Sequence, residues 1–330
     1  MSDLDVVVVG FHSRDLVIRC LDSVPDAAAG LSCTITVVYN GSGDGTVAAV
    51  EGWAADRPWL EVTATDLGAN TGFAHAANAG MALGHAAYVA LLNPDTVADP
   101  GSLTRLVEAL RTLHSVPSVP SAPSVLSGRS SRPSEPAAIV APTLRYADGR
   151  PQLTARSFPT ASAGLFGRRS VLTKLLPGNR WSRRFLVERD HAGETEPYRV
   201  DWVSGAAMVL PRVVLDRFGG FDEGYFLFWE DADWCRRLAG AGYSVWCVPD
   251  ATVRHDEGGT RRHTGSALAT RSFHAGAYRY WRTHHAPQPW NPLRWAAAAA
   301  LGSRALLLLA AHRVERLAAP RNPLTEGIRP

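Results

Sequence analysis

The chain alternates short apolar runs with stretches whose apolar residues recur at helical spacing. The first run, 5–9, contains four valines and stops at Gly10, which is typical of a buried parallel strand. A helix is predicted over 13–21 after a serine cap, a second strand over 34–39 and a second helix over 47–53. This strand–helix–strand–helix order predicts an α/β fold around a mostly parallel sheet.

One segment interrupts this pattern without dividing the domain. Residues 114–136 are dense in serine and proline and lack apolar periodicity, so we expect a flexible surface insertion there. Strand-like residues resume at 138–141. We therefore predict one α/β domain over 1–260 and a helical region over 261–330. Further strands are expected at 61–65, 87–92, 200–210 and 243–249, with a tight Ser204-Gly205 interrupting the third of these. Further helices are expected at 102–113, 165–176 and after Pro211.

A glycine-rich loop follows the strand predicted over 34–39, at the sheet edge where ligands bind in open α/β folds. It reads Asn40-Gly41-Ser42-Gly43-Asp44-Gly45-Thr46. Its spacing matches neither the dinucleotide fingerprint nor the Walker A loop, which argues against a dehydrogenase. The spacing instead allows a turn whose backbone amides are free for a ligand.

Polar residues also follow other predicted strands. Asn70 and Asn78 flank small residues, and this spacing would aim their amides into one cleft, although Asn70 and Gly72 also suit an ordinary turn. Asp95 comes just after the strand predicted over 87–92, where it would point to the ligand edge; a Pro-Asp turn is the alternative. His255 follows a later strand as a candidate metal or phosphate ligand, a role that a lone histidine usually lacks.

The densest group of candidate catalytic residues is 221–237, where an aromatic run ends in Glu230, Asp231 and Asp233. Aromatic walls exclude water, and clustered carboxylates can then have their pKa tuned. The alternative is that these acids only face the positive end of a helix dipole. Asp233 lies about 200° around a helix from Asp231, so we expect it to pair with Arg237 one turn on rather than share a task.

Composition limits the partners and the cellular compartment that we expect. The net charge of +3 is mild, and we expect no nucleic-acid partner. The four cysteines form no C-x-x-C pair, which suggests neither a zinc site nor disulfides and favours a reducing compartment. The N-terminus lacks the pattern of a signal peptide. A basic cluster between Arg168 and Arg184 suits a solvated face or contact with an anionic diphosphate or headgroup.

The C-terminal region is predicted to be helical over 273–316. Its apolar part, 296–311, is interrupted by Arg304 and is shorter than the ~20 residues of a spanning helix. A helical wheel gathers the charged side chains and a histidine on one half, which suits a helix lying on a membrane surface. A packed helix or a homodimer seam are the alternatives. The gathered residues are Arg294, Arg304, His312, Arg313, Glu315 and Arg316.

Taken in order, these segments resemble the inverting family 2 glycosyltransferases of the GT-A fold. Among them they look most like bacterial rhamnosyltransferases that act on lipid-linked diphosphate sugars. The resemblance covers roughly 4–260 and implies a nucleotide-diphospho-sugar transferase fold with a C-terminal helical extension. It is carried by Val6-Val7-Val8-Val9-Gly10-Phe11-His12-Ser13, Asn40-Gly41-Ser42, Asp44-Gly45-Thr46, Asn70-Thr71-Gly72-Phe73, Asn78, Gly80, Asn93-Pro94-Asp95, Val203-Ser204-Gly205, Gly219-Gly220-Phe221-Asp222-Glu223, Trp229-Glu230-Asp231-Ala232-Asp233 and His255.

The resemblance also implies roles for the nucleotide-sugar donor and a divalent metal. Asp95 matches the last carboxylate of the metal-binding motif, and His255 matches a position that completes the metal or diphosphate site, with Mg²⁺ or Mn²⁺ as the cation. Tyr39 and His12 depart from the family's usual Asp and Asn. Donor binding is assigned to Phe11, His12, Ser13, Tyr39, Asn40, Gly41, Ser42, Asn70, Gly72, Phe73, Asn78 and Asn93.

For catalysis, Asp231 matches the family's base, and Glu230 is assigned to supporting that base or binding the acceptor. Inversion by single displacement needs one base facing the acceptor hydroxyl, and a cation neutralises the departing nucleotide diphosphate. Acceptor binding is assigned to Trp202, Ser204, Gly205 and Trp229.

The expected activity is transfer of L-rhamnose from dTDP-rhamnose to a lipid-linked or glycan acceptor in cell-wall or polysaccharide synthesis. N-acetylglucosaminyl-diphosphoryl-polyprenol is the best specific acceptor. The alternatives are a family 2 enzyme that uses a UDP-hexose and a non-catalytic glycan- or nucleotide-binding relative, against which Asp95 and Asp231 argue. We expect the protein in the cytoplasm, peripheral at the inner face of the plasma membrane.

Overall fold

The computed structural model describes residues 2–114, 135–152, 154–160, 193–256 and 266–318. The body of the predicted insertion, the predicted helix at 165–176 and the basic cluster lie outside these ranges. The strands are β1 (Leu4–Gly10), β2 (Cys33–Tyr39), β3 (Glu61–Asp66), β4 (Tyr88–Leu92), β5 (Thr96–Ala98), β6 (Ala137–Arg145), β7 (Pro151–Gln152), β8 (Ala155–Arg156), β9 (Tyr198–Val200), β10 (Trp202–Val203), β11 (Ala207–Pro211) and β12 (Ser244–His255). The helices are α1 (Arg14–Ala27), α2 (Thr46–Ala55), α3 (Phe73–Leu83), α4 (Ser102–His114), α8 (Arg212–Phe218), α9 (Glu230–Gly240), α10 (Ser266–His284) and α11 (Pro292–Ala318).

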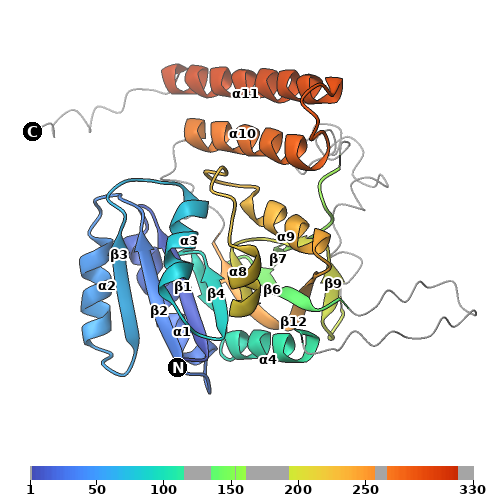
Figure 1. Ribbon diagram of the computed structural model, residues 1–330. Coiled ribbons are helices and arrows are strands. Elements are labelled where there is room, and N and C mark those ends of the chain that lie inside the picture. Colours follow the sequence, from blue (N-terminus) through green and yellow to red (C-terminus); the bar gives the residue numbers. More distant parts are fainter. Residues whose placement is uncertain (1, 115–134, 153, 161–192, 257–265, 319–330) are drawn as a thin grey trace, which may run out of the picture.

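One large sheet organises the described part of the chain (Figure 1). Its order is β3-β2-β1-β4-β11-β6-β12-β5, with β7 beside β6 and β9 beside β12. The strands from β3 to β4 run parallel, whereas β11 runs antiparallel between β4 and β6. A separate pair joins β8 to β10. The α/β fold with a parallel core is thus confirmed, and the carboxyl ends of β1, β2 and β4 meet at one edge.

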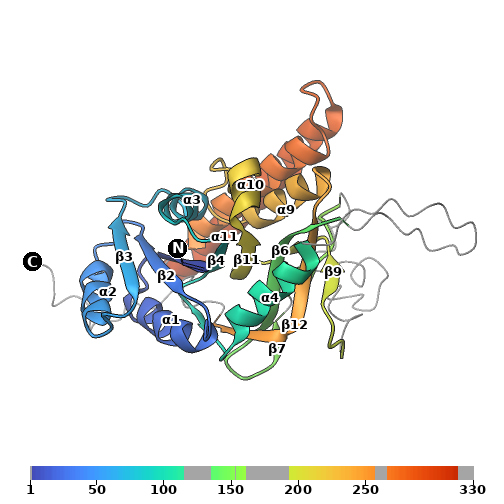
Figure 2. The same ribbon diagram turned by 60° about the horizontal axis from the view of Figure 1, so that its bottom comes forward.

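The valine run of β1 is buried on both sides, as its sequence predicted. Val6 and Val8 pack with α1, α2 and α4 in one core, while Val7 and Val9 pack with α3, α8 and α9 in the other. Successive side chains of a strand point to opposite faces, so an unbroken valine run fills both cores. Figure 2 shows α1, α2 and α4 together on the face turned toward the viewer.

Two long helices follow the sheet, where one continuous helical region was expected. α10 packs onto the second core through Tyr280, which is buried there. α11 lies along α10 (Figure 1), and Arg304 donates to Nε2 of His274 on α10 at 2.8 Å. Three prolines between 286 and 293 separate the helices, since proline removes a backbone donor and restricts the residue before it.

The length of α11 corrects one expectation. The apolar run appeared too short to cross a membrane, yet the helical window Pro292–Val314 spans 23 residues with the length and composition of a spanning helix, and none of that window is buried. The helix extends beyond the apolar run at both ends because Trp295 and Val314 continue it.

The strand predicted over 200–210 is interrupted at Ser204-Gly205, as expected, and is divided once more at Asp201. It forms β9, β10 and β11, and a turn at Ser204–Ala206 separates the last two. The strand predicted over 243–249 continues to His255 as β12, with an irregularity in its pairing between Val248 and Thr252. Both features matter for function, because that turn and the end of β12 carry candidate site residues.

Candidate active site

The donor side of the site is organised by Asn40, the residue that follows β2. Its side-chain nitrogen donates to Oδ1 of Asn70 and to the carbonyl of Gly72, each at 3.2 Å. Its side-chain oxygen accepts from the backbone N–H of Thr71 at 2.9 Å and from the Thr71 hydroxyl at 3.1 Å. Asn40 is buried, so its amide fixes the loop after β3 against the end of β2.

Two glycines allow the close approach of these loops. A side chain at Gly41 would lie 2.4 Å from the backbone of Ala69, and one at Gly72 would lie 2.6 Å from the carbonyl oxygen of Phe226. Both glycines also have positive φ, which favours glycine over any residue with a Cβ. The next residue, Phe73, donates its N–H to that same Phe226 carbonyl at 2.7 Å. The donor loop therefore touches the segment that leads to Asp231.

The loops after β1 and β2 also bond to each other. The N–H of His12, which has φ 49°, donates to the Ser42 hydroxyl at 2.8 Å. The Tyr39 hydroxyl accepts from the N–H of Asp44 at 2.8 Å. Phe11 donates its N–H to Oγ of Ser13 at 3.0 Å. Tyr39, which stands where the resemblance expects an acid, thus supports the glycine-rich loop from beneath.

The proposed metal ligands come together from separate strands. Nε2 of His255 lies 3.3 Å from Oδ1 of Asp95, and both side chains are buried. Nδ1 of His255 bonds to Oε1 of Gln152 at 2.7 Å. A proton on Nδ1 leaves Nε2 as the nitrogen that can ligate, which is how histidine ligands are commonly oriented. Gln152, which orients His255 from β7, carries no local signal in the sequence that would single it out.

The Asp95–His255 pair suits a divalent cation that takes some of its ligands from the protein and others from a substrate. Neighbouring ligands of an octahedral ion with bonds of about 2.1 Å lie about 3 Å apart, close to the separation seen here. Within the described residues, no group of three or more His, Cys, Asp or Glu side chains could enclose a metal. The remaining positions would fall to water and phosphate oxygens, as is usual for Mg²⁺.

The turn at 204–206 connects the loop of the proposed metal ligand Asp95 to the proposed base, Asp231. The Asn93 N–H donates to the carbonyl of Ala206 at 2.8 Å. The preceding residue, Gly205, donates its N–H to Oδ2 of Asp231 at 3.0 Å. Ala206 therefore holds the loop that carries Asp95, and its neighbour Gly205 holds the carboxylate of Asp231. The acceptor role predicted for Gly205 stays a prediction, and its visible role is to hold Asp231.

Asp231 and Glu230 are adjacent carboxyls in the first turn of α9, and burial raises the pKa of both. The negative charge of Asp231 raises the pKa of Glu230 further. For Asp231, hydrogen bonds from the N–H groups of Gly205 and Ala232 and the charge of Arg156 act to lower the pKa. Asp231 is therefore the first of the two to ionise, so it is the acid better suited to act as a base.

Two tryptophans assigned to the acceptor lie close to Asp231 in the chain or in space. Trp202 is buried beneath the guanidinium of Arg156, 4.9 Å from its ring centroid, and donates from Nε1 to the carbonyl of Ser157 at 2.9 Å. Trp229 directly precedes Glu230, and its Nε1 is a buried donor without a partner among the described residues. Sequence reasoning missed Arg156, because nothing local to β8 marks it as a neighbour of Asp231.

The remaining predicted residues have structural contacts of their own. The Asn78 amide donates to the carbonyl of Phe221 at 2.9 Å and to Glu223 at 3.0 Å, and it accepts from the Phe221 N–H at 2.9 Å. Asn78 thereby fastens α3 to the chain before α9. The pairing expected for Asp233 is confirmed, with Nε of Arg237 at 2.8 Å from its Oδ2.

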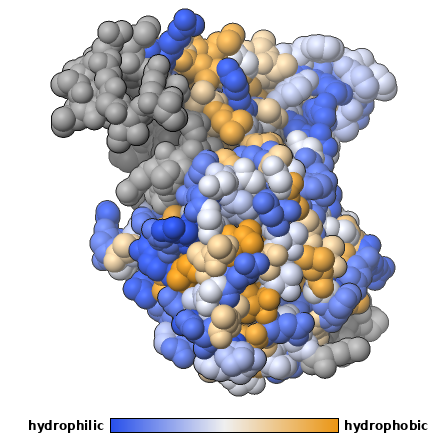
Figure 3. All heavy atoms as spheres, turned by 90° about the vertical axis from the view of Figure 1, so that its left-hand side faces the viewer, coloured by the Kyte–Doolittle hydropathy of each residue, from blue (hydrophilic) through white to orange (hydrophobic). Residues whose placement is uncertain are grey.

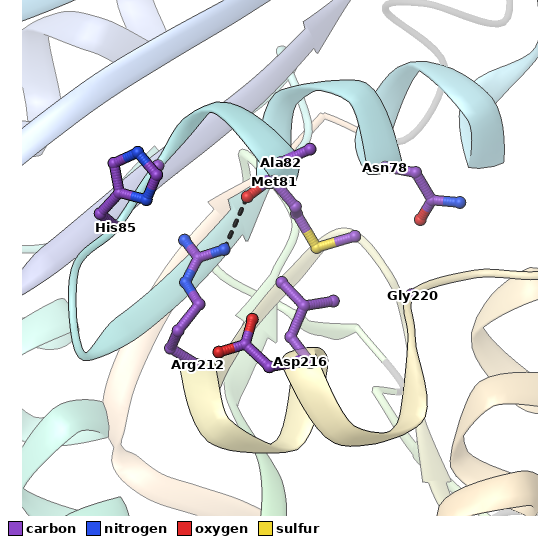
Figure 4. A pocket seen from close by; sticks show the side chains of 9 residues that line it. Asn78, Met81, Ala82, His85, Arg212, Asp216 and Gly220 are labelled. Atoms are coloured by element: carbon purple, nitrogen blue, oxygen red, sulfur yellow. Dashed lines mark hydrogen bonds between the residues drawn. The ribbon is translucent and has the colours of Figure 1, made fainter.

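A surface groove of about 570 Å³ lies between α3 and α8 and contains none of the proposed catalytic or metal residues. Figure 4 shows Arg212 in this groove, donating to the carbonyl of Met81. Arg212 also forms an ion pair with Asp5 at 2.6 Å. The Arg212 guanidinium is therefore already engaged by the protein.

The chain belongs to glycosyltransferase family 2: the family described as "Glycosyltransferase like family 2" matches residues 2–273. It is therefore a transferase enzyme. It is similar to the N-acetylglucosaminyl-diphospho-decaprenol L-rhamnosyltransferase of Mycobacterium tuberculosis, with 30% identity over 322 residues and 94% of each chain covered. A shorter match of 50 residues, covering 15% of this chain and 19% of the relative, is 44% identical to the rhamnosyltransferase WbbL of Escherichia coli.

Solved structures agree on the fold. The mannosyltransferase PcManGT of Pyrobaculum calidifontis, in complex with GDP-Man and Mn²⁺, superposes with a TM-score of 0.55 at 18% identity, covering 97% of this chain and 82% of that one. GalNAc-T7 with UDP, GalNAc and Mn²⁺ gives 0.52 at 14% identity, covering 78% and 44%. The GT-A fold predicted from the motifs is thus confirmed.

Proposed function

We propose that this enzyme transfers L-rhamnose from dTDP-L-rhamnose, with inversion, to N-acetylglucosaminyl-diphospho-polyprenol at the inner face of the plasma membrane. The product would serve cell-wall or polysaccharide synthesis. The observation that carries the proposal is the turn at 204–206, which holds the Asp231 carboxylate on one side and the Asp95 loop on the other. The rhamnosyltransferase name of a relative similar over 94% of the chain supports the choice of sugar and acceptor.

Asp231 acts as the general base in this proposal. It takes the proton from the acceptor hydroxyl while that oxygen attacks the anomeric carbon of the donor and the nucleotide diphosphate leaves from the opposite face. The half-buried carboxylate is oriented by the N–H groups of Gly205 and Ala232, at 3.0 and 2.7 Å. Glu230 keeps its proton next to it, so the pair carries one charge rather than two.

Asp95 and His255 would hold a divalent cation, Mg²⁺ or Mn²⁺, against the diphosphate of the donor. Such a cation supplies neutralisation of the charge that develops on the leaving diphosphate. The fit rests on the 3.3 Å separation of the ligand atoms and on the Gln152 contact that orients the imidazole. The loops at 11–13, 39–42 and 70–73 would enclose the nucleotide, because the His12–Ser42 bond joins the first two and Asn40 joins the last two at the sheet edge.

α11 would bring the enzyme to the membrane that carries the acceptor. The side chains that face α10 are half-buried, and they include Arg294 and His312. The exposed side chains include large apolar ones, with Arg304 and Arg313 also exposed. Figure 3 shows apolar residues at the top of the molecule, where Figure 1 places this helix. An apolar outer face is the reverse of what water favours on a surface helix and suits an interfacial one. The exposed large residues near or on this helix are Trp290, Leu293, Trp295, Leu306, Leu307 and Val314.

The proposal is tested by a donor screen. The purified protein is incubated with Mg²⁺ or Mn²⁺ and a panel of dTDP-, UDP- and GDP-sugars, and release of nucleotide diphosphate is measured with and without N-acetylglucosaminyl-diphospho-polyprenol. We expect release from dTDP-L-rhamnose that depends on both cation and acceptor. Turnover of UDP-sugars alone would overturn the rhamnose assignment, and binding of donors without turnover of any would support a non-catalytic relative.

A further inference from the structure

The turn before the proposed base has an unusual backbone. Phe228 and Trp229 are consecutive non-glycine residues with φ of 71° and 76°. In this left-handed region a side chain crowds the backbone, so two such residues in a row persist only where the surroundings hold them. Trp229 is also the N-cap residue of α9. The direction in which Asp231 leaves this turn therefore depends on whatever holds Phe228 and Trp229.

α10 supplies that support. The Phe273 ring lies 6.1 Å from the ring of Phe228 and 5.5 Å from that of Trp229, and the Tyr280 ring lies 5.4 Å from Trp229. Between these two aromatic contacts, Gly276 allows the backbone of α10 to reach the turn. A methyl group added at Gly276 would lie 2.9 Å from Cδ1 of Trp229 and 3.0 Å from the carbonyl oxygen of Phe228.

Two polar contacts fix α10 on either side of this packing. Arg279 forms a two-pronged bond to Asp222, with Nε and Nη2 each 2.8 Å from a carboxylate oxygen. His284 reaches Oδ1 of the buried Asp233 on α9 through Nε2 at 2.7 Å. One contact therefore precedes the strained turn in the chain and the other follows it.

We infer that α10 is a positioning element of the active site, and that Gly276 sets the position of the Phe228–Trp229 turn and hence of Asp231. The inference rests on the proposed role of Asp231 as the base. The residues of α10 that carry it, from Gly276 to His284, lie beyond the 2–273 range that the family matches. Since α11 packs along the same helix, the element proposed to contact the membrane is joined to the element that orients the base.

Gly276→Ala tests the inference, with Gly302→Ala as its matched control. Both glycines lie inside long helices, where alanine is favoured over glycine, but a methyl group at Gly302 meets nothing within 4 Å. We expect Gly276→Ala to lower kcat by about 10- to 100-fold, since a displacement of about 1 Å can cost that much. The donor Kd and the thermal unfolding midpoint should stay close to wild type, and Gly302→Ala should match wild type in all three.

A second variant, Phe273→Ala, removes the ring contacts from a side chain that is 39% exposed and so contributes little to the core. It should also lower kcat without weakening donor binding. Wild-type kcat in both Gly276→Ala and Phe273→Ala would overturn the inference, as would a loss of donor binding that equals the loss of rate. Asp231→Asn distinguishes failure of the base assignment from failure of the positioning role. If Asp231→Asn retains full transfer, the base assignment fails. If it abolishes transfer while the two α10 variants are unaffected, only the positioning role of α10 fails.

Discussion

At the scale of single residues, burial raises the pKa of both Glu230 and Asp231, but their other surroundings shift the two pKa values in opposite directions. Burial raises the pKa of Asp231, but two backbone N–H groups and Arg156 offset part of that rise. Burial raises the pKa of Glu230, and the Asp231 charge adds to the rise. Of this adjacent pair, Asp231 is thereby the acid that ionises more readily, which suits the role of base proposed for it.

This difference predicts the pH dependence of the reaction. A base works only when ionised, so kcat should fall as the pH drops through the raised pKa of Asp231, which lies above the ~3.9 of a free aspartate. Glu230→Gln should leave kcat within about tenfold of wild type, because the amide replaces a carboxyl that is already neutral. The check is kcat between pH 4 and pH 8 for both proteins. Abolished transfer in Glu230→Gln alongside an active Asp231→Asn would exchange the two roles.

How far the site could be read from sequence depends on how local each contact is. The Asp233–Arg237 pair follows from a spacing of one helical turn, and the structure contains it. The contacts of Asp95 with His255 and of His255 with Gln152 join strands far apart in the chain. The contact of Asp95 with His255 was expected only from a family resemblance. The contact of His255 with Gln152 was not expected, because no spacing rule relates residues on strands far apart in the chain.

At the scale of elements, Asp233 joins the helix that carries the base to α10. Burial works to raise the pKa of this carboxyl, but hydrogen bonds from His284 and Arg237 outweigh it and hold the pKa below its usual value. A depressed pKa stabilises the fold at every pH above that of an unfolded aspartate, and the contribution is lost as the pH falls through the folded pKa. The α9–α10 contact should therefore weaken only below about pH 4.

Asp233→Asn should lower the free energy of unfolding by about 3 kcal/mol at pH 7, since it leaves Arg237 and His284 without their shared partner. The measurement is urea unfolding at pH 7 and again at pH 3. At the lower pH the gap between variant and wild type should narrow, because the wild-type carboxyl is approaching protonation. A gap that is equal at the two pH values would contradict the electrostatic account of this contact.

The elements themselves were predictable where one physical signal dominates. Runs rich in β-branched residues marked β1 and β2, and an unbroken apolar run marked β4, because strands buried on both faces are mostly apolar. The division of the C-terminal region into α10 and α11 was missed, although the prolines between 286 and 293 carried the signal. The break of the 200–210 run at 204–206 was predictable from Ser204-Gly205, whereas the contacts of that turn with Asp231 and Asn93 were not, since they join residues far apart in the chain.

At the scale of the whole molecule, the proposed membrane contact depends on the exposed apolar face of α11. Leu306 and Leu307 are 70% and 73% exposed, and burying a leucine gains about 1.5–3 kcal/mol. A variant with both Leu306→Glu and Leu307→Glu should bind vesicles containing anionic lipid at least tenfold more weakly, since about 1.4 kcal/mol is a factor of ten. Flotation with vesicles measures the bound fraction.

The matched control for this test is Leu83→Glu, at a leucine on α3 that is 50% exposed and lies on a different element. It should bind vesicles as wild type does. Equal binding by the α11 variant and this control would mean that the face does not contact lipid. In that case its apolar side chains would fit the packed-helix or homodimer alternatives, which sedimentation of the two variants would distinguish.

The most direct measurement of the account is the rate of rhamnose transfer from dTDP-L-rhamnose to N-acetylglucosaminyl-diphospho-polyprenol by wild type and by Asp231→Asn, with donor binding measured on both. We predict acceptor-dependent transfer by wild type, and in the variant a loss of about 10²- to 10⁴-fold, the range that a general base contributes, with the donor Kd unchanged. Full transfer by Asp231→Asn would contradict the central claim, because the carboxylate held by Gly205 would then not be the base.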